Sequence, residues 1–194
     1  MNIKKFKKRF KVTIKINHLK TYFLIPHDFE NYISNILAAL AVMSIFLDIS
    51  KINKNIFNNF KVPNGRGDIS KIKINKKNLN LIDESYNSNP LSLKSAILNY
   101  DKINSNKSKK YLLLGDMLEL GQHSKKLHQS MVTIINQSKI DQVFVKGKNV
   151  SLIFNSVLNS KKGGILDSNF QIIDLINNHL NTVSYTHLTL PTTD

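Results

Sequence analysis

Residues 81–90, LIDESYNSNP, are crowded with side chains that could bind a ligand. Asp83 and Glu84 end an apolar run, and Asn87 and Asn89 lead into a segment that starts with a proline. Carboxylates can hold a ribose hydroxyl or a metal-bound water, and amides beside a helix N-terminus suit an anion. The same residue types also form ordinary turns, in which Ser and Asn side chains satisfy the backbone and bind nothing. The stretch therefore predicts either a binding loop or a plain turn.

A second stretch, LLLGDMLELGQHSKKLH, covers residues 112–128 and carries two acidic residues, Asp116 and Glu119, and two histidines. Asp116 follows an apolar run, where a strand would end and a ligand could meet the carboxylate. His123 and His128 do not have the i, i+4 spacing that places two metal ligands on one helix face, and the sequence has no HExxH. We predict no zinc site here. His128 is either a functional residue or an ordinary surface residue of a helix.

The elements around these two stretches alternate between apolar runs and helical patterns from residue 71 onward. The expected strands are residues 71–75, 79–83, 110–116, 141–147 and 163–167, and the expected helices are 90–103, 123–138, 150–158 and 169–180. Repeated strand–helix units predict an α/β fold with a doubly wound, mostly parallel sheet. Ligands bind such sheets outside the carboxyl ends of the strands. Both polar stretches follow strands, so we expect them to meet at one edge of the sheet.

The first third of the chain has a different pattern. Residues 10–17 and 21–25 alternate with period two and predict a hairpin. Residues 30–49 predict a helix that is buried on most sides. Ser50 is the expected cap of a second helix over residues 51–60.

The formal net charge of +15 allows two explanations. A basic chain suits a nucleic-acid or anionic-membrane partner. Alternatively, the lysine excess reflects a genome rich in A and T, because Lys, Asn and Ile crowd the chain while only Arg9 and Arg66 are arginines. We favour composition, since the arginine–aromatic mixture of nucleic-acid readers is missing. A basic nucleic-acid-binding module remains the alternative function, which steeply salt-dependent binding would reveal.

Several classes of protein are disfavoured by simple features of the sequence. The chain has no cysteine, which excludes disulfides, thiolate zinc sites and a cysteine nucleophile. No export signal follows the basic start. The longest apolar run, residues 36–47, is shorter than the roughly 20 residues of a membrane span. We therefore expect a cytoplasmic protein without a membrane span.

Taken together, LIDESYNSNPLSLKSAI and LLLGDMLELGQHSKKLH resemble the C-terminal domain of the Mur ligase family, in order and in approximate spacing. Residues 31–43 resemble the helix that closes the central ATPase domain of this family, and residues 62–68 resemble the linker to the last domain. The resemblance covers most of residues 10–182 and implies a Rossmann-like C-terminal domain. Folyl-polyglutamate synthetases share this domain, but the paired motifs argue against them.

The resemblance implies an ATP-dependent amide-bond ligase of peptidoglycan synthesis in the cytoplasm, with roles in cell wall biogenesis, cell shape and cell division. Within the family it points to the ligases that join D-alanyl-D-alanine to UDP-N-acetylmuramoyl-tripeptide. ATP and Mg²⁺ are the implied cofactors, and the implied partners are these small-molecule substrates, with no specific nucleic acid. A carboxylate is a poor electrophile, so phosphorylation supplies a leaving group before an amine attacks. The longer parent enzyme is expected to be a monomer.

The resemblance also places residues around the nucleotide. Asn35 matches a position beside the adenine, and Arg66 matches the linker arginine that reaches the nucleotide. Asp83 and Glu84 match the acidic pair near the ribose. The family usually has a histidine four residues before Asn35, where this chain has Asn31.

The remaining matches lie in the two polar stretches. Asn87 and Asn89 match asparagines of the family's binding loop. Asp116 matches an aspartate that faces the site from the next strand, on the acceptor side, and His128 matches a family histidine. Asp116 and His128 are therefore our candidate catalytic residues.

A large part of the implied enzyme is missing from the sequence. No GxxxxGK[ST] phosphate loop occurs, because the single Gly147–Lys148 pair is followed by Asn149. We expect residues 1–64 to be the end of the central domain and residues 65–182 to be a truncated C-terminal domain, inactive as a ligase by itself.

The last residues, VSYTHLTLPTTD (183–194), differ in composition from everything before them. They contain no lysine, isoleucine or asparagine. The segment resembles the in-frame translation of a sequencing adapter. We expect a non-native tail there, in place of the next strand that the pattern requires.

Overall fold

The computed structural model describes residues 2–6, 8–16, 18–75, 77–103, 108–180 and the backbone of 184–189. The chain divides into two compact units, Met1–Lys61 and Val62–Asp194. In the described residues, no helix combines the length and apolar composition that a membrane crossing requires.

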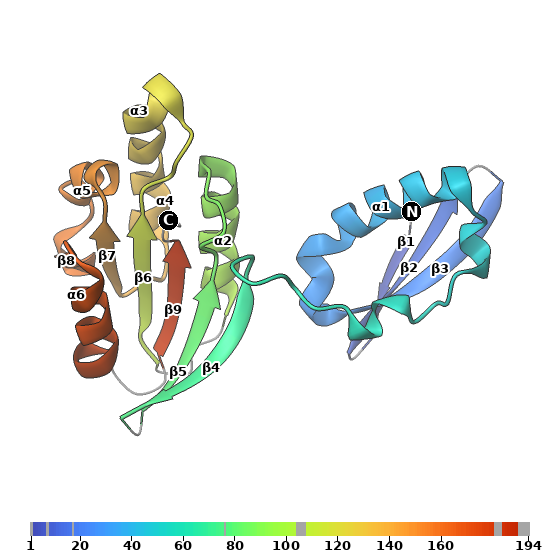
Figure 1. Cartoon of the computed structure of the whole chain (residues 1–194), viewed down its shortest axis with the longest axis horizontal. Coiled ribbons are helices and arrows are strands. Elements are labelled where there is room, and N and C mark those ends of the chain that lie inside the picture. Colours follow the sequence, from blue (N-terminus) through green and yellow to red (C-terminus); the bar gives the residue numbers. More distant parts are fainter. Residues whose placement is uncertain are drawn as a thin grey trace. The chain divides into compact units, whose positions relative to one another are not determined.

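The first unit is a small antiparallel sheet with one long helix. Strands β1 (Asn2–Lys5), β2 (Arg9–Ile16) and β3 (Leu19–Pro26) pair in that order. The predicted hairpin is therefore confirmed as β2 and β3, and β1 adds a strand that the sequence pattern did not reveal. Alternate residues of β2 are buried, and α1 (Ile33–Phe46) lies along the sheet (Figure 1) with Ile33, Ile36 and Leu40 buried.

The predicted second helix over residues 51–60 is wrong. This segment contains two short 3₁₀ turns, Ile49–Lys51 and Ile56–Asn59, separated by extended backbone at Ile52. The cap is Asp48 rather than Ser50, because the Asp48 carboxylate accepts from the Ser50 N–H at 2.9 Å. A second side chain, Asn53, accepts from the Asn55 N–H at 2.9 Å. Such local side-chain bonds compete with helix formation, which explains the failure of the apolar pattern.

The second unit contains a six-stranded sheet. Its strands are β4 (Asp68–Ile74), β5 (Lys77–Asp83), β6 (Lys110–Gly115), β7 (Gln142–Lys146), β8 (Lys162–Ile165) and β9 (Ser184–Thr189). The order across the sheet is β4-β5-β9-β6-β7-β8. Only the pairing of β4 with β5 is antiparallel. Figure 1 shows the arrowheads of β5, β9, β6 and β7 pointing to the same edge.

Helices cover both faces of this sheet, as predicted for a doubly wound fold. They are α2 (Pro90–Lys102), α3 (Ser124–Gln129), α4 (Met131–Gln137), α5 (Lys148–Phe154) and α6 (Asn169–Asp174), which continues as a π-turn (Leu175–His179). One core joins Leu112 and Leu114 of β6 to residues of α2, α4 and α5. The other joins Tyr111 and Leu113 to residues of α6 and its π-turn. Alternate residues of β6 thus enter opposite cores, so the strand is buried on both faces.

The expectation that no strand follows Thr182 is wrong. The backbone of Ser184–Thr189 forms β9, which pairs in parallel with β5 on one side and β6 on the other. Tyr and Thr favour extended backbone, and pairing with a strand on each side satisfies the backbone of this segment. The origin of residues 183–194 in an adapter stays a prediction, because a strand of any origin could occupy this gap.

Candidate functional site

The two polar stretches follow strands that end at one edge of the sheet, but they are not immediate neighbours. Asp83 pairs with Leu188 of β9, and Leu188 pairs with Leu113 of β6. Two strand spacings, about 10 Å, therefore separate the ends of β5 and β6. Asp116 lies three residues beyond Leu113 at the same edge. The residues form two groups, which we call the β5 cluster (Arg66, Asp68, Asp83, Glu84 and Tyr86) and the β6 cluster (Asp116, Met117, His128, Gly147 and Asn149).

The β5 cluster is held together by the loop that precedes β4. The Gly67 N–H donates to the Asp83 carbonyl at 2.6 Å, and the Tyr86 N–H donates to the Gly65 carbonyl at 3.1 Å. Gly65 has φ +74°, and a Cβ there would lie 3.0 Å from the Tyr86 nitrogen, so only glycine fits. Asp68 completes the loop by accepting from the Gly65 N–H at 2.7 Å. The linker is thus fixed onto the end of β5.

This attachment places Arg66 against Tyr86, two residues beyond the acidic pair predicted from the sequence. The Arg66 guanidinium lies 4.1 Å from the centroid of the Tyr86 ring, which is a cation–π contact. The Asp83 carboxylate accepts from the Ser85 N–H at 2.9 Å. Burial raises the pKa of Glu84 to about 7, with smaller contributions from the charges of Asp83 and Asp68. Near neutral pH, Glu84 can therefore either donate or accept a hydrogen bond.

The two asparagines of the loop have different environments. The Asn89 side-chain oxygen accepts from the Leu91 and Ser92 N–H groups at 3.0 and 2.9 Å. Ser92 reciprocates by accepting from the Asn89 N–H, which completes a capping box at the start of α2. Asn87 is exposed to solvent in the preceding loop. Asn89 thus has the helix-capping role expected for this turn, and binding through either amide stays a prediction.

The β6 cluster is organised around the carboxylate of Asp116. Asp116 Oδ1 accepts from the backbone N–H groups of Asn149 and Val150, at 2.9 and 2.8 Å. The Asn149 side-chain amide reaches Oδ2 at 3.4 Å. Gly147 has φ +139°, and a Cβ at this position would lie 2.6 Å from the Asp116 Cγ. The carboxylate therefore caps α5 from the neighbouring strand, and the glycine makes room for it.

His128 is wholly buried, so its interpretation as a surface helix residue is wrong. Its Nε2 accepts from the Met117 N–H at 2.9 Å, and its Nδ1 lies 2.8 Å from the Ser124 carbonyl. A carbonyl can only accept, which assigns the proton to Nδ1 and makes the imidazole neutral. Nε2 also lies 3.9 Å from Asp116 Oδ1. His128 therefore fixes the backbone that follows Asp116.

The comparisons with known proteins decide the family. The model of the family described as "Mur ligase, glutamate ligase domain" matches residues 70–181, more than half of the chain. The chain belongs to the Mur ligase family.

Curated relatives carry the name of one Mur ligase. The UDP-N-acetylmuramoyl-tripeptide–D-alanyl-D-alanine ligase of Bacillus subtilis is 32% identical over 133 residues, which cover 69% of this chain and 28% of the relative. The ligase of the same name from Rickettsia prowazekii is 29% identical over 140 residues, covering 71% of this chain and 29% of the relative. The chain thus spans less than a third of the length of these Mur ligases.

Solved Mur ligases share the fold. MurF from Acinetobacter baumannii superposes with a TM-score of 0.71 at 19% identity, covering 97% of this chain and 41% of that one. MurF from Thermotoga maritima, solved in complex with ADP, gives 0.67 at 18% identity, covering 97% of this chain and 42% of that one. At this identity the likeness establishes the fold alone, which is the predicted α/β fold.

The predicted Mur ligase residues fall into three places. Arg66, Asp83 and Glu84 lie together in the β5 cluster, while Asp116 and His128 lie together in the β6 cluster. Asn35 belongs to the first unit, where it is exposed on α1. In the described residues, no group of three His, Asp or Glu side chains is arranged to hold a metal ion.

Five residues of the two clusters were missed from the sequence: Asp68, Tyr86, Met117, Gly147 and Asn149. Asp68 and Tyr86 are brought in by hydrogen bonds to Gly65, made by the Asp68 carboxylate and the Tyr86 N–H, which no local pattern encodes. Gly147 and Asn149 carried a signal, because a glycine directly after an apolar strand marks a close backbone approach at the ligand-binding edge.

Proposed function

We propose that the chain is part of an ATP-dependent ligase of peptidoglycan synthesis, one that joins D-alanyl-D-alanine to UDP-N-acetylmuramoyl-tripeptide in the cytoplasm. The family match and the names of the relatives support this proposal. The observation that carries it is the common edge of the sheet, where the β5 cluster and the β6 cluster follow parallel strands. The chain supplies the end of the central domain and the C-terminal domain of a longer enzyme.

The β5 cluster fits the sugar and base end of a nucleotide. Asp83 and Glu84 offer acceptors for ribose hydroxyls, and the protonated form of Glu84 can also donate. The planar Arg66 guanidinium, stacked on Tyr86, can contact a base or an anionic group from its outer side. These residues would orient the nucleotide through its neutral part.

The same cluster does not fit a triphosphate. Three carboxylates, those of Asp68, Asp83 and Glu84, are close enough to interact electrostatically and would repel phosphate. The sequence also lacks a glycine-rich phosphate loop. When bound, ATP and Mg²⁺ activate a carboxylate by phosphorylation, and we assign the phosphates and the metal mainly to the rest of the longer enzyme. The chain by itself should then be inactive.

The side chains of the β6 cluster position backbone segments rather than transfer protons. The Asp116 carboxylate accepts from backbone N–H groups at the start of α5. Both ring nitrogens of neutral His128 are hydrogen-bonded to the backbone. We infer that both residues position the edge that faces the acceptor amine. This assigns them a supporting role in the ligation.

A chimera tests the proposal. The C-terminal domain of the Bacillus subtilis relative is replaced by residues 62–194 of this chain, and phosphate release is measured with D-alanyl-D-alanine and the tripeptide nucleotide. We expect ligation by the chimera and none by the isolated chain. Arg66→Ala in the chimera should raise the KM for ATP, while Lys73→Ala, on an exposed part of β4, should leave it unchanged. A folded chimera that forms no product would refute the proposal, and so would ligation by the isolated chain.

A further inference from the structure

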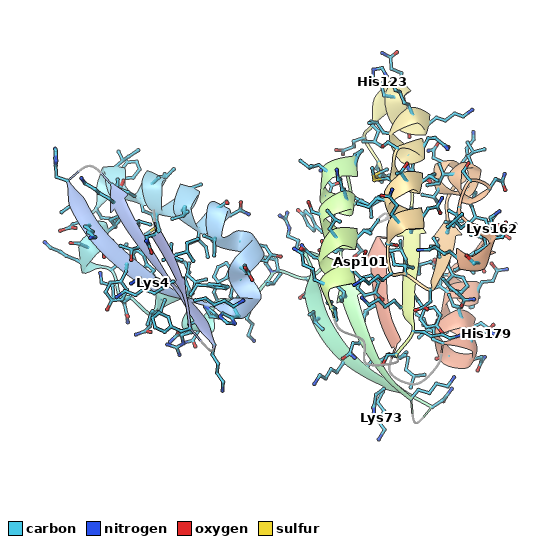
Figure 2. All side chains as sticks on the ribbon, turned by 180° about the vertical axis from the view of Figure 1, so that it is seen from behind. Lys4, Lys73, Asp101, His123, Lys162 and His179 are labelled. Carbon is cyan, nitrogen blue, oxygen red and sulfur yellow. The ribbon has the colours of Figure 1, made fainter. Side chains whose placement is uncertain are left out.

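One face of the antiparallel sheet in the first unit is lined with lysines. The side chains of Phe10, Val12 and Ile14 point to the buried face, so the residues between them point the other way. That outer face carries four lysines from three strands: Lys4, Lys11, Lys15 and Lys20, which we call the lysine face (Lys4 is labelled in Figure 2). These residues come from separate parts of the chain and meet only through strand pairing.

The pairing places like charges directly opposite each other. Lys4 is the partner of Lys11 across β1 and β2, and Lys15 is the partner of Lys20 across β2 and β3. Directly opposed like charges destabilise a sheet. The three strands contain no acidic residue, so none of their own side chains neutralises the face. An external anion is the simplest counterpart for such an arrangement.

An aromatic side chain lies among these charges. Tyr22 on β3 pairs with Thr13, in the row between the two lysine pairs, and its ring is partly exposed. The Lys11 ammonium lies 4.2 Å from the centroid of this ring. Lysines that flank an exposed aromatic ring suit a strand of nucleotides, because phosphates pair with the ammonium groups while a base stacks on the ring.

We propose that the lysine face binds single-stranded nucleic acid through its phosphates, without reading the sequence. Such a chain is extended, as are the strands below it, and can follow the rows of lysines. A lipid surface fits less well, because interfacial binding needs apolar groups that enter the membrane, and on this face Leu24 is half-buried. Base-specific readout is not implied, because the arginine at the end of the face, Arg9, donates to Asn55 at 3.3 Å. This binding is separate from the ligase proposal and concerns the first unit alone.

The slope of affinity against salt tests the proposal. A labelled oligothymidylate is titrated with the full chain and followed by fluorescence anisotropy across roughly 50–200 mM salt. Four phosphate contacts predict a log–log slope of about −2.8, equivalent to about a 50-fold loss of affinity over this range. Lys15→Gln together with Lys20→Gln should reduce the slope to about −1.4, or about a sevenfold loss. Tyr22→Ala should weaken binding without changing the slope.

The matched control removes the same charge elsewhere. Lys71 and Lys73 are exposed lysines of β4 in the second unit, and Lys71→Gln with Lys73→Gln should leave the slope unchanged. Thermal melting confirms folding; the Lys15/Lys20 variant should melt no lower than the wild type, because it loses a like-charge pair. Equal effects of the two double variants would show diffuse attraction to the net charge and overturn the proposal. Binding to phosphatidylserine vesicles that depends on Lys15 and Lys20, without oligonucleotide binding, would also overturn it.

Discussion

Replacing Asp116 should destabilise the start of α5, independently of any effect on catalysis. Asp116→Ala removes the acceptor of two backbone N–H groups, bound at 2.8 and 2.9 Å, and leaves both at the edge of the core. Hydrogen bonds to a charged group contribute about 1.5–3 kcal/mol, and loss of an N-cap costs about 0.5–2 kcal/mol. The side chain is largely buried, so water cannot fully replace it. We predict a loss of about 2–3 kcal/mol in the free energy of unfolding for Asp116→Ala and about 1 kcal/mol for Asp116→Asn, which keeps one oxygen.

Urea denaturation followed by circular dichroism measures this loss, and hydrogen exchange locates it. The amides of Asn149 and Val150 should lose protection in Asp116→Ala, while those of β6 should change less. The control is Asp167→Ala, which removes an exposed carboxylate after β8 and should stay within about 0.5 kcal/mol of the wild type. An Asp116→Ala variant as stable as this control, with unchanged exchange at α5, would refute the capping role.

Three further outcomes follow from the structure. The pKa of Glu84 is raised to about 7 from its usual value of 4.5, so the folded state binds its proton more tightly than the unfolded state, and stability should fall as pH rises from about 4.5 through 7. In urea titrations, Glu84→Gln should reduce the loss of unfolding free energy between pH 5 and pH 8 by about 1 kcal/mol, since partial solvation screens the charge. An unchanged pH profile would contradict this. Asn89→Ala should destabilise α2 by about 1 kcal/mol, and Asn87→Ala should cost almost nothing by the same denaturation assay. Equal losses would show that Asn89 is not the cap. Removal of residues 183–194 should abolish cooperative unfolding, because β9 bonds to strands on both sides; unchanged melting would instead support the tail as a passive addition.

The alternation of strands and helices was readable in the sequence because each element of the second unit satisfies its own pattern. Apolar runs covered on both faces, as in β6, give strands, and Asn89 followed by Pro90 marks the start of α2. The helix predicted after Ser50 does not form, because the side chains of Asp48 and Asn53 accept from the backbone N–H groups of Ser50 and Asn55. The unusual composition after Thr182 led to the wrong expectation that no strand forms there. Pairing with β5 and β6 can order a segment of such composition as β9.

The sequence predicted where the candidate site lies, but not how its residues are bonded to the rest of the fold. Parallel strands end at one edge, so Asp83 and Asp116 had to lie there. The number of strands between them depends on β9, which the local pattern could not reveal. The partner of Asp116 is the start of α5, more than thirty residues later, and such a bond exists only in the folded sheet. For the same reason, burial of His128 could not be inferred from a helix in which Lys125 and Lys126 precede it.

Amide chemical-shift mapping with adenosine and ADP tests the central claim most directly, namely that the end of β5 receives the nucleotide. In a ¹⁵N-labelled sample, both ligands should shift the amides of Arg66, Gly67 and residues 83–86, and ADP should bind no more tightly than adenosine because the carboxylates oppose its phosphates. Glu84→Gln should leave the same amides responsive. Shifts confined to another place, such as the hollow of about 470 Å³ between β8 and α6 that Phe144, Gly163 and Leu175 line, would contradict the account.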